Sequence, residues 1–215
     1  MPLWIVLALV SCAEPTGPAA VPYAVQWVEW PAGVSAAQPG AVLVTYFGDF
    51  CSTLSLGVSA DFPLVTVNSE ATRHPNCSPP PLLPPLFLSD TLLSLPALPA
   101  PYGLPAYYTI QATLADPGFD TPSLRDLGSI RLAATGDTTR YMAGAASLLV
   151  DSAGCTVMLP ALFGLTRTYA VLNPPALGGQ VRRALVGAHI SSAAAPGCGT
   201  HRVVQLDYAI VALVP

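Results

Sequence analysis

The segments YYTIQATL (Tyr107–Leu114) and VVQLDYAI (Val203–Ile210) alternate apolar side chains with polar or small ones. This period of two is typical of a β-strand with one face against a core. The chain has 24 Pro and 17 Gly in 215 residues, and they separate it into short apolar or alternating segments. These features predict an all-β protein with frequent turns and few helices.

Similar segments recur along the whole chain. Within Ala24–Trp30, apolar residues occupy both parities, which indicates a strand covered on both faces, at the centre of a sheet or between two units. The strands predicted in the first half are Ala24–Trp30, Ala41–Phe47, Thr53–Val58, Leu64–Asn68, Leu86–Leu88 and Tyr107–Leu114. Those predicted in the second half are Gly128–Ala134, Arg140–Val150, Cys155–Leu159, Tyr169–Leu172, Ala184–Ser192 and Arg202–Leu213.

The first half resembles bacterial immunoglobulin-like modules. A Pro-rich loop, Leu95–Gly103, comes before its last strand, and that strand has the order Tyr108-x-Ile110-x-Ala112, which is similar to the closing hairpin of those modules. The resemblance implies an immunoglobulin-like β-sandwich over residues 23–115. Residues 116–122 are turn formers and acids, so we place a linker at residues 116–125.

The second half resembles the small OB-like β-barrel. The similarity rests on Gly128-x-Ile130-x-Leu132, then Leu185-Val186-Gly187-Ala188-x-Ile190, then the alternating segment Val203–Ile210. In OB-like barrels a glycine-kinked first strand wraps the barrel and the last strands close it. The resemblance implies such a barrel over residues 126–215, and a second β-sandwich remains an alternative.

The N-terminus resembles the leader of bacterial lipoproteins. Residues 3–10 are all apolar, and Leu9-Val10-Ser11-Cys12 is similar to a lipobox. The resemblance implies a signal peptide over residues 1–11, diacylglycerol attached to Cys12, and a flexible tether over residues 12–22. Ala13 after the cysteine favours the outer membrane, facing the periplasm or the cell surface. The alternative is a buried first strand with a free thiol at Cys12.

The four remaining cysteines predict disulfides, and the net charge bears on the kind of partner. Cys51, Cys77, Cys155 and Cys198 are even in number in a chain expected to be exported, so we predict two disulfides. Three pairings are open, and Cys51–Cys77 with Cys155–Cys198 places one in each half. The net charge of -4 argues against a nucleic-acid partner, because phosphate binding depends on clustered basic side chains.

The sequence contains no recognisable catalytic motif, so we expect no catalytic residues, no metal and no cofactor. Asp49, Asp61, Asp137 and Asp151 fall in predicted turns, where aspartate caps its own backbone. The expected function is non-catalytic binding or structure in the cell envelope, with the membrane as one partner through Cys12 and an envelope protein or polysaccharide as another.

Two alternatives from other classes depend on histidines. One is a secreted hydrolase that uses His74 or His201. The other is a metal-binding envelope protein that uses His189 and His201, with Cys155 and Cys198 as free thiolates.

Overall fold

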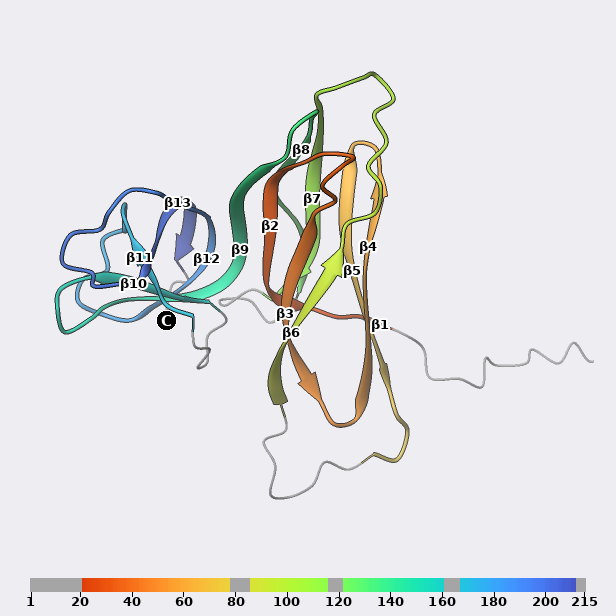
Figure 1. The fold of residues 1–215 in the computed structure, drawn as a ribbon. Coiled ribbons are helices and arrows are strands. Elements are labelled where there is room, and N and C mark those ends of the chain that lie inside the picture. The colour runs from red at the N-terminus through yellow and green to blue at the C-terminus, as the bar shows by residue number, and fades with distance from the viewer. Residues whose placement is uncertain (1–20, 78–85, 116–121, 161–166, 212–215) are drawn as a thin grey trace, which may run out of the picture.

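A computed structural model describes residues 21–77, 86–115, 122–160 and 167–211. The described chain is all-β, as expected, and its thirteen strands form a sandwich joined to a small barrel (Figure 1). All the strands predicted from the sequence are present, but some ends differ by several residues: the predicted Leu86–Leu88 extends to Ser94, and the strand predicted from Gly128 begins at Ser123. The described residues include no helix that is long and apolar enough to cross a membrane.

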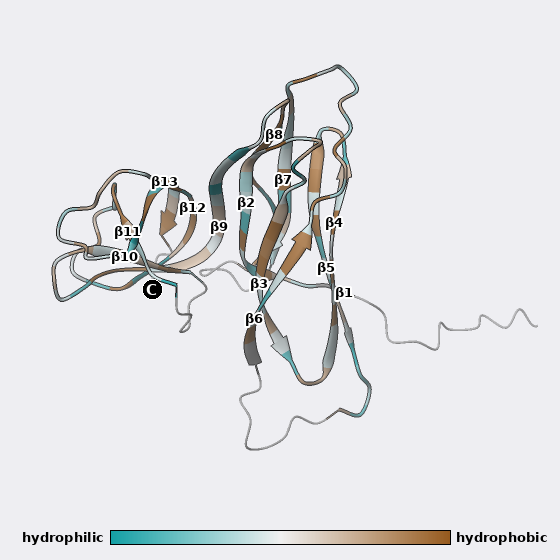
Figure 2. Cartoon of the chain, in the orientation of Figure 1, coloured by the Kyte–Doolittle hydropathy of each residue, from teal (hydrophilic) through white to brown (hydrophobic). Residues whose placement is uncertain are grey.

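The sandwich has two layers around a common core. One layer has the order β6-β3-β2-β9, and the other contains β4, β5, β7 and β8, with β5 and β7 parallel. Fully buried Val28, Ile110 and Ile130 fill the space between the layers, and apolar residues run along the strands of both units (Figure 2). The bounds are β1 Val21–Pro22, β2 Val25–Val34, β3 Ala41–Asp49, β4 Ser52–Asp61, β5 Leu64–Arg73, β6 Leu86–Ser94, β7 Ala106–Leu114, β8 Ser123–Leu132 and β9 Asp137–Val150.

The barrel shares β9 with the sandwich. It closes in the order β9-β10-β11-β13-β12 and back to β9, with β11 and β13 parallel. This order makes it an OB-like barrel. Its core includes Met142, Met158 and Val204, together with Trp27, which comes from the sandwich strand β2. The remaining bounds are β10 Thr156–Pro160, β11 Tyr169–Val171, β12 Arg182–Ile190 and β13 Arg202–Val211.

Gly144 marks the point where β9 passes from one unit to the other. One edge of β9 pairs with β2 from Asp137 to Gly144 and with β10 from Ala146 to Val150. The other edge pairs with β12. Gly144 has φ +151°, and a Cβ there would lie 2.2 Å from the carbonyl oxygen of Gln26. Only glycine therefore allows β9 to turn against β2 at this point.

The strand pairing divides the chain differently from the sequence. Strand β8, expected to begin the barrel unit, pairs along its length with β7 and sends Ile130 and Leu132 into the sandwich core. The turn formers near residue 120 therefore connect two antiparallel neighbours, because proline, glycine and aspartate mark a hairpin as well as a linker. The barrel begins within β9. Val21 and Pro22, at the end of the expected tether, form β1 against β5.

Both predicted disulfides are present, one in each unit. Cys51–Cys77 joins the β3–β4 turn to the segment after β5, and Cys155–Cys198 joins two loops at one end of the barrel. Their sequence separations are 26 and 43 residues. By restricting the unfolded chain, disulfides that close loops of these lengths stabilise the folded state by about 3.5 and about 4 kcal/mol, respectively.

Replacing Gly144 by alanine tests the importance of the shared strand. We expect Gly144→Ala to lower the free energy of unfolding by about 3–5 kcal/mol, since it adds backbone strain and a collision with β2. Because both units contain β9, the loss should appear in probes of the sandwich and of the barrel. Chemical denaturation would measure it. Gly57→Ala is the control, because a Cβ at Gly57 meets nothing within 4 Å; equal stabilities of the two variants would contradict the expectation.

Candidate functional site

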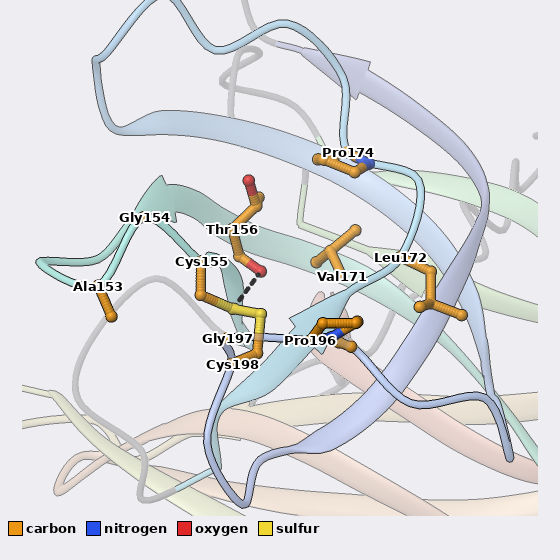
Figure 3. Close-up of a pocket in the computed structure, with 11 residues that line it drawn as sticks. Ala153, Gly154, Cys155, Thr156, Val171, Leu172, Pro174, Pro196, Gly197 and Cys198 are labelled. Carbon is orange, nitrogen blue, oxygen red and sulfur yellow. Dashed lines mark hydrogen bonds between the residues drawn. A yellow bond between two sulfur atoms is a disulfide. The ribbon is translucent and has the colours of Figure 1, made fainter.

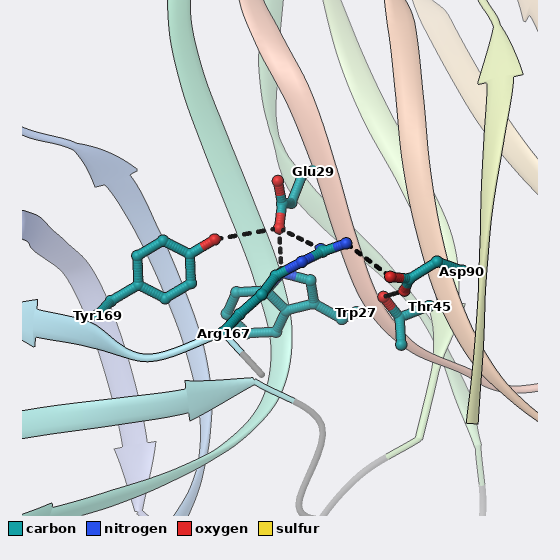
Figure 4. A network of polar contacts seen from close by, with 6 residues as sticks. All are labelled: Trp27, Glu29, Thr45, Asp90, Arg167 and Tyr169. Carbon is teal, nitrogen blue, oxygen red and sulfur yellow. Dashed lines mark hydrogen bonds and ion pairs between the residues drawn. The ribbon is translucent and has the colours of Figure 1, made fainter. Parts of the chain in front are cut away.

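A polar network connects the barrel to the sandwich. Its centre is Glu29, which is the one charged residue of β2 and is 9% exposed. Glu29 Oε1 accepts hydrogen bonds from Trp27 Nε1 at 3.2 Å and from the Tyr169 hydroxyl at 3.4 Å. Arg167 Nη1 lies 3.1 Å from the same oxygen (Figure 4). These donors replace the water that burial removes from the carboxylate.

Arg167 extends the network to a second sandwich strand. Its Nη2 lies 2.6 Å from Asp90 Oδ2 on β6, and Asp90 Oδ1 accepts a hydrogen bond from Thr45 on β3 at 2.5 Å. Figure 4 shows the guanidinium reaching from the chain before β11 to the acids on β2 and β6. One cation thus joins the barrel to both strands. Each of these groups has a partner within the network, so the network is suited to fixing the two units together.

Tyr169 is held in its protonated form at this junction. Burial, followed by the nearby charge of Glu29, raises the pKa of the Tyr169 phenol to about 12. The phenol therefore remains a hydrogen-bond donor to Glu29 at neutral pH. An anionic phenolate next to Glu29 would be unfavourable, which fits a structural use of this hydroxyl.

A separate recess lies at the disulfide end of the barrel. It has a volume of about 280 Å³ and lies between the β9–β10 turn, the end of β11 and the β12–β13 loop (Figure 3). Asp151 Oδ1 fixes the turn by accepting hydrogen bonds from the amides of Ala153 and Cys155, both at 2.9 Å. The Cys155–Cys198 disulfide holds the opposite loop against it. The walls of the recess are therefore constrained on both sides.

None of the described residues that line the recess has a charged side chain. Thr156 supplies a hydroxyl, Val171 and Leu172 supply apolar surface, and the rest is Ala, Gly, Pro and the disulfide. In OB-like barrels, the second and third strands together with the loops after the first and fourth form the ligand-binding face. Those elements here are β10, β11, the β9–β10 turn and the β12–β13 loop. The recess occupies that face.

The structure accounts for most of the residues singled out in the sequence. Cys51, Cys77, Cys155 and Cys198 form the two predicted disulfides, and of the three pairings left open the structure has the one with a disulfide in each half. Cys12, with the expected signal peptide and most of the expected tether, lies outside the described residues, as do residues 116–121 of the expected linker.

Three of the turn aspartates, Asp49, Asp137 and Asp151, cap the backbone as predicted, and the fourth, Asp61, is the last residue of β4. Asp49 Oδ1 accepts a hydrogen bond from the amide of Cys51 at 2.7 Å, and Asp137 Oδ1 accepts one from the amide of Thr139 at 2.9 Å. Asp151 acts in the same way before Cys155. Two of these caps lie next to disulfide cysteines, so they also position the sulfur-bearing residues.

The histidines lie apart from one another. His189 on β12 contacts Asp207 on β13 through Nδ1 at 2.9 Å. His189 pairs with Gln205 across the two strands, and His201 comes four residues before Gln205. Because a strand rises by about 3.3 Å per residue, His201 lies well away from His189. Among the described residues, no group of three or more His, Cys, Asp or Glu side chains could hold a metal ion.

His74 has a hydroxyl partner but lies at an exposed position. Its Nε2 is 2.8 Å from Thr53 Oγ1. The recess at the barrel end is not lined by His74, His189 or His201. A hydroxyl–imidazole contact becomes a catalytic pair when a third group orients the base beside a substrate pocket, and the contacts of His74 do not provide this arrangement.

Sequence reasoning missed Glu29, Asp90 and Arg167 as a group. The available signal was Glu29 itself, a single acid within the apolar segment Ala24–Trp30. A buried carboxylate requires a partner. The sequence could not identify that partner, because Arg167 is separated from Glu29 by 138 residues.

The chain matches no known family model, no curated protein and no solved structure.

Removing the Arg167 cation tests the polar network. We expect Arg167→Gln to lower the free energy of unfolding by about 1–3 kcal/mol, because Glu29 then remains buried with fewer donors. The change should also alter the fluorescence of Trp27, which binds the same oxygen. Arg73→Gln, at an exposed position, is the matched control and should change stability by less than about 0.5 kcal/mol. Equal effects of the two substitutions would contradict a stabilising role for Arg167.

Alkaline titration tests the environment of Tyr169. Because folding raises its pKa from 10.0 to about 12, the folded state holds the proton more tightly than the unfolded state. The resulting stabilisation is complete below pH 10 and is lost as the pH rises towards 12. Denaturation across this window should show a steeper fall in stability for the natural chain than for Tyr169→Phe, by on the order of 2 kcal/mol. Parallel curves would exclude this contribution, and Tyr107→Phe, at an exposed site, is the control.

Proposed function

We propose that this protein is a lipid-anchored binding protein of the cell envelope with no catalytic role. The observation that carries the binding role is the barrel-end recess between two loops fixed by Cys155–Cys198. The lipobox-like Leu9–Cys12 segment supports anchoring. Two disulfides support an exported protein, because such bonds persist in oxidising compartments.

The chemistry of the recess supports binding over catalysis. Catalysis requires a nucleophile or base held near an oriented partner. The lining of this recess offers the Thr156 hydroxyl, backbone groups of a Gly-containing turn, and aliphatic surface. These groups can hold an uncharged segment by hydrogen bonds and apolar contact. The nearby disulfide keeps the walls in place before a ligand arrives, which lowers the entropic cost of binding.

An uncharged partner fits this surface better than a polyanion. Phosphate-rich ligands are held by clustered lysine and arginine, and the recess is lined by neither. An envelope polysaccharide or an extended segment of an envelope protein has the required neutral, hydrogen-bonding character. The hydrolase and metal-binding alternatives have no comparable support. In the structure both sulfurs of the proposed thiolate ligands are in a disulfide.

Incorporation of a fatty-acid analogue tests the anchor. In a bacterium that processes lipoproteins, the natural chain should be labelled and should remain with the membrane fraction. Cys12→Ser should be unlabelled and released, whereas Cys51→Ser should still be labelled, which controls for the loss of a thiol. Absence of label on the natural chain, with Met1–Ser11 retained in its intact mass, would overturn the anchor.

Photo-crosslinking in the same cells tests the recess independently of the anchor. A photoreactive side chain at Thr156 should form discrete adducts with an envelope component, identified by mass spectrometry. The control is the same side chain at Ser55, an exposed residue on β4 that lines neither the recess nor the two sandwich cavities described below. Adducts at Thr156 alone support binding at the barrel face. Equal adducts at both positions, or none at Thr156, would overturn it.

A further inference from the structure

A second cavity lies at the end of the sandwich, away from the barrel-end recess. It has a volume of about 550 Å³ and is formed by the β2–β3 turn, the β6–β7 connection and the β8–β9 turn. Figure 1 shows the β6–β7 connection rising over this end of the sandwich, where β2 turns into β3. The volume is within the range of about 300–1,000 Å³ that is usual for small-molecule sites.

The lining of this cavity is almost wholly apolar. Apart from Ser35, the lining residues in the described part of the chain are all Ala, Leu, Val, Pro or Gly. The Ser35 hydroxyl accepts a hydrogen bond from the amide of Gln38 at 3.1 Å, so it already has a partner. Six of the lining residues are alanines, at positions 36, 37, 97, 100, 133 and 134, where larger side chains would fill the space. The cavity therefore suits a flexible aliphatic group.

A polar cavity adjoins the apolar one. Its volume is about 330 Å³, and it shares Val34, Pro39 and Gly40 with the apolar cavity. Because these three residues line both cavities, the cavities are neighbours, and a single ligand that lies across the shared residues would contact both.

The polar cavity is lined by one charge of each sign. Arg140 donates a hydrogen bond through Nη1 to the carbonyl of Ala41 at 3.2 Å, which fixes a guanidinium that has several further donors. Hydrogen bonds from Thr139 lower the pKa of the Asp137 carboxyl, so this group is ionised at neutral pH. Gln38 adds an amide to the lining. A head group with both charges would be complementary to this pair.

We propose that the two cavities form one binding site for a single-chain zwitterionic amphiphile, such as a lysophospholipid. The acyl chain would occupy the apolar cavity, the phosphate would contact Arg140, and the ammonium group would lie near Asp137. This site goes beyond the proposed function and depends on neither the anchor at Cys12 nor the barrel-end recess.

Titration with lysophospholipids of increasing acyl length tests the proposal directly. The protein used is the full-length Cys12→Ser chain, so that its own lipid cannot compete, and ligand concentrations stay below micelle formation. Affinity should rise by about fourfold per added methylene until the cavity is full and then level off. A continued rise at every length would indicate adsorption to a surface, and absence of binding at all lengths would also overturn the site.

Head-group exchange tests the polar cavity. The zwitterionic ligand should bind up to about fivefold more tightly than an anionic lysolipid with the same chain, because the anion gains nothing from Asp137. Asp137→Asn should remove this preference, and Arg140→Gln should weaken both ligands, which share the phosphate. Arg73→Gln, at the last residue of β5 and outside both cavities, should leave the affinity and the preference unchanged. The head group alone, without a chain, should not bind measurably. An equal preference in all variants would overturn the head-group assignment.

Filling the apolar cavity with a larger side chain tests the proposed position of the acyl chain. Ala133→Phe should weaken lysophospholipid binding by at least about tenfold, because the ring occupies the space of several methylenes. Ala134→Phe, at an exposed lining position, gives the same test if Ala133→Phe does not fold. Ala194→Phe, in an exposed barrel loop, is the matched control and should bind normally. Unchanged affinity in a folded cavity-filling variant would overturn the proposal, and so would displacement of the lipid by an apolar peptide of higher affinity.

Discussion

The sharing of β9 between two cores is the constraint on which the rest of this structure depends. A strand that belongs to both a sandwich and a barrel must change partners along one edge, and β9 does so at Gly144. The close approach of Gln26 and Trp27 leaves no room for a side chain there. As a result, residues Met142–Leu148 are all buried, because both faces of the strand are covered. The barrel in turn receives Trp27 from β2, so its core is completed by the neighbouring unit.

The polar network follows from the same sharing. Placing β2 between the sandwich layers and the barrel buries Glu29, whose charge must then be compensated inside the protein. Arg167 and Tyr169 from the barrel side provide this compensation, and Asp90 pairs with the second terminal nitrogen of the guanidinium. Such a network contributes little from any single ion pair, since desolvation opposes attraction. The network instead favours one arrangement of the two units, since that arrangement gives each donor and acceptor a partner.

Much of the local structure was predictable from the sequence, while the division into units was not. The period-two segments predicted the strands, and the ambiguous pattern of Ala24–Trp30 predicted a strand covered on both faces, as β2 is. The even number of cysteines in a chain expected to be exported predicted two disulfides, and the pairing was left open. The segment near residue 120 was misleading, because the same turn formers mark a hairpin and a linker. The partners of Glu29 and the two adjoining cavities depend on residues far apart in sequence, and no local pattern encodes such proximity.

The β2–β9 pairing also determines how the molecule carries mechanical load. The two strands are antiparallel, with partners from Trp27 opposite Gly144 to Gly33 opposite Asp137. Hydrogen bonds in such a ladder lie perpendicular to the strands. A force that draws the barrel away along β9 would therefore strain many of these bonds at once instead of opening them one at a time. In that direction the junction behaves as a shear clamp, and the barrel and the sandwich transmit tension as one body.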